Sequence, residues 1–173
     1  MLSPAVAFQM VTMLEDVVDR GTASSARRLG VRFPAGGKTG TTDDFKDAWF
    51  VGFSPTLVAG VWVGFDQPET MAREAFASRY ALPIWADFMQ QAARIRPVGQ
   101  FERPAGLHEE TLCAESFRQP VDGCPLYTEY FKDGDQVPEG LCPLHRGTIR
   151  QRVARAVQGW VSEVGRQIRG IFR

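Results

Sequence analysis

A short run from Gly36 to Thr42 contains the residue types of this chain that are best suited to binding an anionic group. It reads Gly-Gly-Lys-Thr-Gly-Thr-Thr, so one lysine lies between glycines and is followed by hydroxyl side chains. Glycine lets a ligand approach the backbone closely, lysine supplies a compact positive charge, and threonine hydroxyls donate and accept hydrogen bonds. The run therefore indicates a site for an anionic ligand.

A phosphate-binding loop is one interpretation of this run, and the residues around it exclude that interpretation. Such a loop needs the pattern G-x-x-x-x-G-K-[ST] between a strand and a helix. The position of the first glycine is held by Arg32. The segments that follow, Ala48 to Phe53 and Leu57 to Phe65, are rich in valine and aromatic residues, which favour strands over a helix.

The alternative is the K-T-G element that lies on a strand beside the nucleophilic serine of penicillin-interacting enzymes. Here Lys38-Thr39-Gly40 stands in a longer pattern, and that pattern resembles the class A penicillin-binding proteins from about Leu2 to Met89. The stretches that carry the resemblance are Arg20-Gly21-Thr22-Ala23, Gly37-Lys38-Thr39-Gly40-Thr41-Thr42, Asp47-Ala48-Trp49-Phe50-Val51-Gly52-Phe53-Ser54-Pro55 and Gly60-Val61-Trp62-Val63-Gly64-Phe65-Asp66.

The resemblance implies a role for each residue of the element. Lys38 would contribute positive potential near the serine, and the hydroxyls of Thr39 and Thr41 would bind the terminal carboxylate of a D-Ala-D-Ala stem peptide or of a β-lactam. Gly40 completes the substrate-binding element. The backbone N–H of Thr41 would supply half of the oxyanion hole. The implied reaction is D,D-transpeptidase acyl transfer, which crosslinks peptidoglycan and needs no cofactor.

The nucleophile of that reaction is missing from the sequence. The family carries it in S-x-x-K, and a second motif reads S-x-N or S-D-N. The chain has no asparagine, and its three lysines are preceded at the third position by Ala35, Asp43 and Glu129. We therefore expect no catalysis by this chain alone, and we expect the activity to belong to a parent protein that also has a glycosyltransferase domain.

Three further interpretations stay open. The parent could transfer its acyl group to water, as a D,D-carboxypeptidase or β-lactamase does. The chain could instead be a non-catalytic remnant that binds cell-wall fragments or a partner. It could also be an incomplete gene product that starts at an internal methionine, since the helix signals of Ser3 and Pro4 follow Met1 at once.

Composition sets the broad class. With 173 residues, 44% apolar and 23% charged, the chain has the make-up of a globular protein, and its formal net charge of zero gives no drive toward nucleic acid. No apolar run is long enough to cross a membrane, and the N-terminus lacks the layout of an export signal. The resemblance nevertheless implies a parent anchored in the inner membrane and facing the periplasm.

The predicted fold class is α+β: part of a penicillin-binding, β-lactamase-like transpeptidase domain over residues 1–95. Ser3 and Pro4 predict the start of a helix that ends near Gly21. Short connections between strands imply antiparallel pairing. Because the last two strands are apolar at nearly every position, we expect helices on both faces of the sheet. The other elements expected are a short helix over 23–29, strands over 33–42, 48–53 and 57–65, and a helix from Pro83 to Ile95.

Three carboxylates close to the K-T-G element could suggest acid–base or metal chemistry. Asp43, Asp44 and Asp47 directly follow the predicted strand. A solvated turn explains the first two, and Asp47 is expected to pair locally. We assign them no catalytic role and no metal.

Residues 96–148 are rich in proline and glycine and read as an irregular appendage with short strands. The segment holds Cys113, Cys124 and Cys142, with His145 three residues after the last cysteine. A Cys₃His zinc site is one interpretation, but there is no closely spaced first pair. A disulfide with one free thiol is favoured, and no metal is assigned. His108 is expected to be a surface residue.

Residues 149–173 predict a basic amphipathic helix. Its apolar residues fall on one helical face and its arginines on the opposite face. A helix docked on the domain is the favoured interpretation, and contact with an anionic membrane surface is the alternative.

Overall fold

The computed structural model describes residues 2–150, 153, 156–157 and 161. The chain forms two compact units, Met1–Pro104 and Ala105–Arg173, which we call unit 1 and unit 2. The domain boundaries expected at residues 95 and 148 stay predictions.

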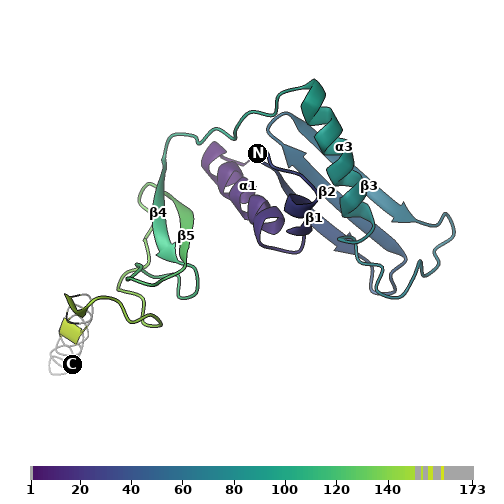
Figure 1. Ribbon diagram of the computed structural model, residues 1–173. Coiled ribbons are helices and arrows are strands. Elements are labelled where there is room, and N and C mark those ends of the chain that lie inside the picture. The colour runs from purple at the N-terminus through teal and green to yellow at the C-terminus, as the bar shows by residue number, and fades with distance from the viewer. Residues whose placement is uncertain (1, 151–152, 154–155, 158–160, 162–173) are drawn as a thin grey trace, which may run out of the picture. The chain divides into compact units, whose positions relative to one another are not determined.

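Unit 1 is a three-stranded antiparallel sheet with helices packed against it (Figure 1). The strands follow one another in space in the order β1-β2-β3, as short connections predict. This confirms the predicted α+β class. The elements of unit 1 are α1 (Pro4–Asp19), α2 (Ser25–Arg28), β1 (Gly36–Thr41), β2 (Asp47–Ser54), β3 (Leu57–Gly64) and α3 (Ala81–Ile95).

Helix α1 begins where the sequence predicts. Ser3 is its N-cap, and the Ser3 hydroxyl accepts a hydrogen bond from the backbone N–H of Val6. The apolar face was expected to pack on the sheet, but Met10 and Met13 are about half exposed and only Val18 of this helix is fully buried. The described chain therefore covers one end of that face and leaves the other open.

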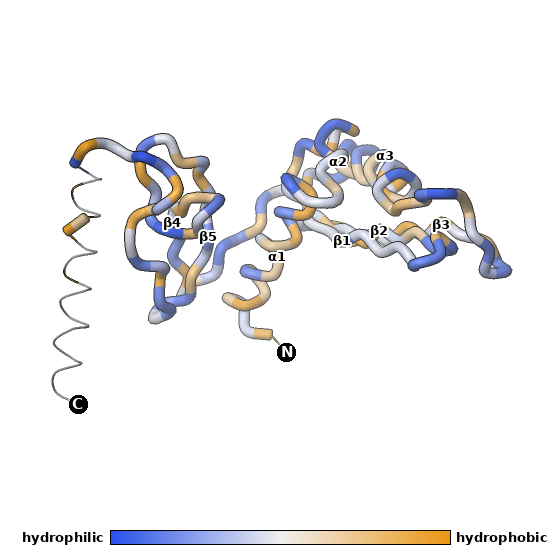
Figure 2. Tube along the Cα trace, turned by 90° about the horizontal axis from the view of Figure 1, so that it is seen from below, coloured by the Kyte–Doolittle hydropathy of each residue, from blue (hydrophilic) through white to orange (hydrophobic). Residues whose placement is uncertain are grey.

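The sheet is covered by α2 and α3 on the same side, as Figure 2 shows. Along β2, Ala48, Phe50 and Gly52 are buried, whereas Trp49 and Val51 are 47% exposed. Trp49 and Val51 thus lie on a second face of the sheet. On that face, the β3 side chains Trp62 and Val58 are 41% and 70% exposed. Helix α1 contacts this second face only at the start of β1, where Gly36 lies against the backbone of Leu14 and Glu15. The expectation that helices cover both faces is therefore met only in part for the described residues, because the rest of the second face is exposed, as in a one-sided antiparallel sheet.

The packing of α3 on β2 depends on a glycine. Phe50 and Trp85 meet edge to face with ring centroids 4.8 Å apart, and both side chains are fully buried. A Cβ at Gly52 would lie 2.6 Å from Cζ2 of Trp85 and 2.7 Å from Cε1 of Phe50. Two aromatic rings fill the space above Gly52, so the position has no room for a side chain.

We predict that Gly52→Ala destabilises unit 1 by about 1–3 kcal/mol, the usual range for overpacking a filled core. The matched control is Gly60→Ala on β3, where a Cβ would meet only Cγ2 of Val51 at 3.7 Å. Urea unfolding followed by tryptophan fluorescence measures both variants. Equal stability of the two variants would contradict this account of the core.

The loop that leads into β1 is held by an arginine of α2. The guanidinium of Arg27 donates hydrogen bonds to the carbonyl oxygens of Val31 and Phe33 at 2.9 and 2.8 Å, and it also pairs with Asp19 of α1. These bonds connect α1, α2 and the entry to β1. They fix where the glycine-rich strand starts.

Glu15 of α1 lies against the start of β1, since a Cβ at Gly36 would lie 3.2 Å from the backbone nitrogen of Glu15. Burial, and then repulsion from Asp19, raise the pKa of Glu15 above its ordinary value of 4.5. A carboxyl with a raised pKa in the folded state is less favourable when ionised than it is in the unfolded chain. Ionised Glu15 therefore lowers the stability of unit 1 as the pH rises through its pKa.

We predict that Glu15→Gln raises the melting temperature of the chain at pH 7. The gain should shrink as the pH falls and vanish below pH 4.5, where the carboxyl is protonated in both states. Thermal melts of both proteins between pH 4 and pH 7 test this. A gain that does not change with pH would point to a cause other than ionisation.

Unit 2 contains the antiparallel pair β4 (Leu107–Cys113) and β5 (Leu126–Lys132), so the segment expected to be irregular holds two seven-residue strands. Its buried residues are few among those that the structure describes. They are Leu107 and Leu112 of β4 and a cluster of Cys113, Val121 and Cys142 packed against Cys124 and Leu141. Most of the predicted helix over residues 149–173 lies outside the described residues. The described apolar residues of that segment are exposed, namely Ile149, Val153, Val157 and Val161.

Candidate functional site

The Lys38–Thr41 element lies on β1, which is one of the two outer strands in the order β1-β2-β3. The backbone N–H of Thr42 donates to the carbonyl of Asp47 at 3.2 Å where the two strands join. Residues of an antiparallel pair alternate between facing the partner strand and facing away from it. Because the N–H of Thr42 faces β2, the backbone N–H and C=O groups of Thr41 and Thr39 point away from β2, toward the outer edge of β1.

The side chains of the element lie on both faces of β1. Thr39 and Thr41 pair in register with Phe50 and Ala48 and so lie on the face that α3 covers, whereas Lys38 pairs with Val51 on the other face. The Nζ atom of Lys38 donates to the carbonyl of its neighbour Thr39 at 2.8 Å. The lysine is exposed, and its charge lies directly beside the strand backbone.

Both threonine hydroxyls have partners from distant segments. The hydroxyl oxygens of Thr39 and Thr22 are 3.1 Å apart, and the hydroxyl of Thr41 accepts a hydrogen bond from the N–H of Ala77 at 3.1 Å. Sequence reasoning assigned no role to Thr22 or Ala77. Thr22 could have been found, because it lies in the Arg20–Ala23 stretch that matches the family, whereas the segment around Ala77 carried no such signal.

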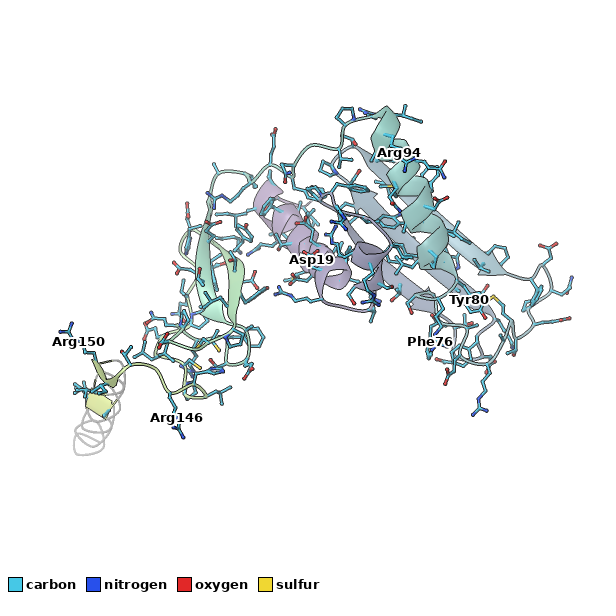
Figure 3. The ribbon with its side chains drawn as sticks, in the orientation of Figure 1. Asp19, Phe76, Tyr80, Arg94, Arg146 and Arg150 are labelled. Atoms are coloured by element: carbon cyan, nitrogen blue, oxygen red, sulfur yellow. The ribbon has the colours of Figure 1, made fainter. Side chains whose placement is uncertain are left out.

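The segment around Ala77 is held at the end of β1 by contacts with the β1–β2 turn. The N–H of Met71 donates to the carbonyl of Phe45 at 3.0 Å, and the rings of Phe45 and Phe76 meet edge to face at 5.2 Å. Figure 3 labels Phe76 beside this end of the sheet. The connection between β3 and α3 therefore forms one wall next to Thr41.

The carboxylates near the element behave as structural groups. Asp44 forms an ion pair with Lys46 at 3.1 Å in the turn. The carboxylate of Asp47 accepts a hydrogen bond from the indole N–H of Trp62 at 2.8 Å. Trp62 lies on β3, 15 residues along the chain, so Asp47 pairs across the sheet and not with its sequence neighbours as expected.

The three cysteines of unit 2 come together with a histidine. Sγ of Cys113 and Sγ of Cys142 are 3.5 Å apart, and the ligand atoms of Cys113, Cys124, Cys142 and His145 all lie within 4.8 Å of one another. A disulfide bond needs about 2.05 Å between the sulfurs. All three thiols are free in the structure, which differs from the favoured expectation of one disulfide.

The electrostatics of this cluster favour a thiolate next to a histidine. Burial raises the pKa of Cys142, but the Ser116 hydroxyl and His145 lower it more strongly, to about 5. The hydrogen bond with Cys142 in turn raises the pKa of His145. Burial raises the pKa of Cys124 to about 11. The other histidine, His108, lies outside the cluster and is half exposed, 3.5 Å from Asp133.

The sequence is similar to penicillin-binding proteins of bacteria. A 133-residue stretch is 41% identical to penicillin-binding protein 1A of Pseudomonas aeruginosa and covers 76% of this chain and 16% of that protein. A 94-residue stretch is 54% identical to penicillin-binding protein 1A of Aquifex aeolicus, covering 54% and 13% of the two chains. No protein-family model matches the chain.

The fold leads to the same class. The crystal structure of penicillin-binding protein 1A from Haemophilus influenzae superposes with a TM-score of 0.71 at 26% identity, over 83% of this chain and 22% of that one. These matches in sequence and fold show that the chain corresponds to a part of a class A penicillin-binding protein. All three relatives are penicillin-binding proteins 1A, and the chain spans 13–22% of their length.

Proposed function

We propose that this chain supplies the K-T-G wall of the active site in a peptidoglycan-crosslinking D,D-transpeptidase. The observation that carries the proposal is the placement of Lys38–Thr41 on an outer strand, with the backbone N–H of Thr41 pointing away from β2. An extended peptide beside such an edge meets backbone donors, hydroxyls and a positive charge together. The substrate class that fits is a peptide ending in a carboxylate, as D-Ala-D-Ala stem peptides and β-lactams do.

Each residue has a distinct part in the proposed reaction. The Lys38 ammonium attracts the substrate carboxylate, and its positive charge stabilises negative charge on groups near the serine. The hydroxyl of Thr41 has a hydrogen to donate to that carboxylate, because its oxygen is the acceptor in the bond with Ala77. The hydroxyl of Thr39 donates to the carboxylate when Thr22 is the donor in the bond that the two threonines share. The N–H of Thr41 stabilises the oxyanion that forms when the substrate carbonyl is attacked.

The nucleophile comes from a part of the parent protein that this sequence does not contain, since S-x-x-K is absent. In the proposed cycle a serine attacks the D-Ala-D-Ala carbonyl and D-alanine leaves. An amine of a second stem peptide then takes the acyl group from the serine. We place the parent at the periplasmic side of the inner membrane. Within the described residues, no helix has both the length and the apolar character of a membrane span.

We predict that the isolated 173-residue chain forms no covalent adduct with penicillin, because it lacks the serine and lysine of the nucleophile motif. Intact-mass measurement after incubation with excess benzylpenicillin tests this. The positive control is any purified penicillin-binding protein that has an S-x-x-K motif. A stoichiometric adduct on the chain would contradict the assignment of the reaction to the parent.

In the complete protein, obtained by extending the reading frame upstream of Met1, we predict that Lys38→Ala slows acylation by a fluorescent penicillin about 10²–10³-fold, the size expected for one lost electrostatic contact to the reacting group. The matched control is Lys46→Ala, which removes a turn lysine paired with Asp44. The control should keep the parental rate.

The products of the complete protein separate the remaining interpretations. Crosslinked stem peptides support the transpeptidase, and release of D-alanine without crosslinks would make it a carboxypeptidase. If the upstream frame is closed and the chain is made alone, the transpeptidase proposal is overturned. A non-catalytic binding role would then take its place.

A further inference from the structure

The cysteine–histidine cluster of unit 2 brings together side chains that can bind a metal ion, and the Lys38–Thr41 site does not use it. Its sulfurs and imidazole nitrogen belong to three separate turns of the chain. Figure 3 shows the sulfur atoms of unit 2, in yellow, gathered at one end of the β4–β5 pair on the side of Arg146. We propose that Cys113, Cys124, Cys142 and His145 bind one Zn²⁺ ion as a structural site.

The distances between ligand atoms lie near those of a tetrahedral zinc site, and two of them fall within its range. Zinc lies about 2.3 Å from sulfur and about 2.0–2.1 Å from nitrogen, so sulfur–sulfur and sulfur–nitrogen pairs around one ion are about 3.5–3.8 Å apart. In the structure, Sγ of Cys113 lies 3.5 Å from Sγ of Cys142 and 3.5 Å from Nδ1 of His145. The Sγ atom of Cys142 lies 3.2 Å from the same nitrogen. Cys124 completes the set within 4.8 Å.

The backbone holds each ligand in place. Cys113 ends β4, and its N–H donates to the carbonyl of Arg118 at 2.9 Å. Sγ of Cys124 accepts a hydrogen bond from the N–H of Val121 at 3.2 Å, which orients this sulfur. The N–H of Cys142 donates to the carbonyl of Gln119 at 2.8 Å, beside the bridge between Gln119 and Leu141. These hydrogen bonds thus hold the three cysteines close together without a disulfide bond.

The two ring nitrogens of His145 are placed as they are in histidine ligands of zinc. Its Nδ1 faces the sulfurs, and its Nε2 lies 3.6 Å from a carboxylate oxygen of Glu115. Metal-bound histidines commonly direct their second nitrogen toward a carboxylate, which fixes the tautomer and makes the first nitrogen a better ligand. Glu115 is therefore a positioning residue of the proposed site.

The types of the four ligands indicate which metal would bind, and their number and burial indicate its role. Three thiolates and one imidazole suit Zn²⁺. Four protein ligands fill the tetrahedron and leave no position for water or substrate, which marks a structural site and not a catalytic one. Cys113 and Cys142 are fully buried.

Unit 2 also needs a source of stability besides its apolar core. Three of the five residues of its core cluster are cysteines, and only Val121 and Leu141 are apolar residues of other kinds. Small units with little buried apolar surface usually depend on disulfides or a metal. Since the thiols here are free, a metal ion is the connection that the geometry supports.

Metal content of the full 173-residue chain is the first test. We expect about one zinc per chain, measured by plasma mass spectrometry after purification without added reductant. Replacement by Co²⁺ should give the visible absorption of a tetrahedral cobalt–thiolate site. A chain without zinc whose intact mass shows the loss of two hydrogens would overturn the proposal in favour of a disulfide.

Variants distinguish ligands from neighbours. His145→Ala should weaken zinc binding, measured by competition with a chromophoric chelator. The loss should exceed the factor of about 10–100 typical of removing a residue that only hydrogen-bonds to a ligand. His145→Cys should retain the metal, because a Cys₄ set also binds zinc. His108→Ala is the matched control and should bind as the parent chain does. Equal binding by His145→Ala and His108→Ala would contradict the ligand assignment.

Glu115→Gln tests the positioning role. It should weaken zinc binding about 10–100-fold, with Glu109→Gln on β4 as the control that leaves affinity unchanged. Unchanged affinity in Glu115→Gln, with His145→Ala still weakened, would remove Glu115 from the site and leave the four ligands in place.

Chelation tests whether the metal stabilises unit 2. Removing zinc should increase amide hydrogen exchange in peptides of β4 and β5 and leave peptides of β1–β3 unchanged, because metal binding is coupled to the folding of the segment that supplies the ligands. Unchanged exchange in β4 and β5 would overturn a structural role. This outcome is independent of penicillin acylation, so the metal site and the transpeptidase proposal can fail separately.

Discussion

The hydrogen-bond register between β1 and β2 is the constraint on which the candidate site depends. A shift by one residue would turn the Thr41 N–H toward β2 and move both threonine hydroxyls to the other face. The turn fixes this register, since the Thr42 hydroxyl accepts hydrogen bonds from the N–H groups of Lys46 and Asp47, both at 3.0 Å. The buried pair Gly37 and Gly52 fixes it again, because each lies against an aromatic ring that leaves no room for a side chain.

Local signals in the sequence predict the elements of unit 1 well. Ser3 caps α1 as expected, and the strands begin and end within a few residues of the predicted positions. Burial is harder to predict, because tryptophan and valine suit an exposed pleated surface as well as a buried one. The sequence of β2 therefore indicates a strand without showing that Trp49 lies on an open face and Phe50 under α3.

The contacts that position the site come from tertiary structure. Nothing in the local pattern of residues 71–77 predicts that Ala77 donates to Thr41. The cysteines show the same limit of local reasoning. The first two cysteines, Cys113 and Cys124, are far apart in the sequence. The closely spaced pair of possible ligands is the last one, Cys142 and His145, with two residues between them. The folding of β4 against β5 then brings Cys113 and Cys124 to that pair.

The outward-facing backbone of β1 also bears on self-association. Among the described strands β1 forms an edge, and an exposed edge can pair with a strand from another copy of the chain. Three of its six residues are glycines, which have low strand propensity, and Lys38 puts a charge at its centre. Residue types that suit the recognition of a carboxylate thus also discourage edge-to-edge aggregation, so a single strand can remain open to a peptide without recruiting a second sheet.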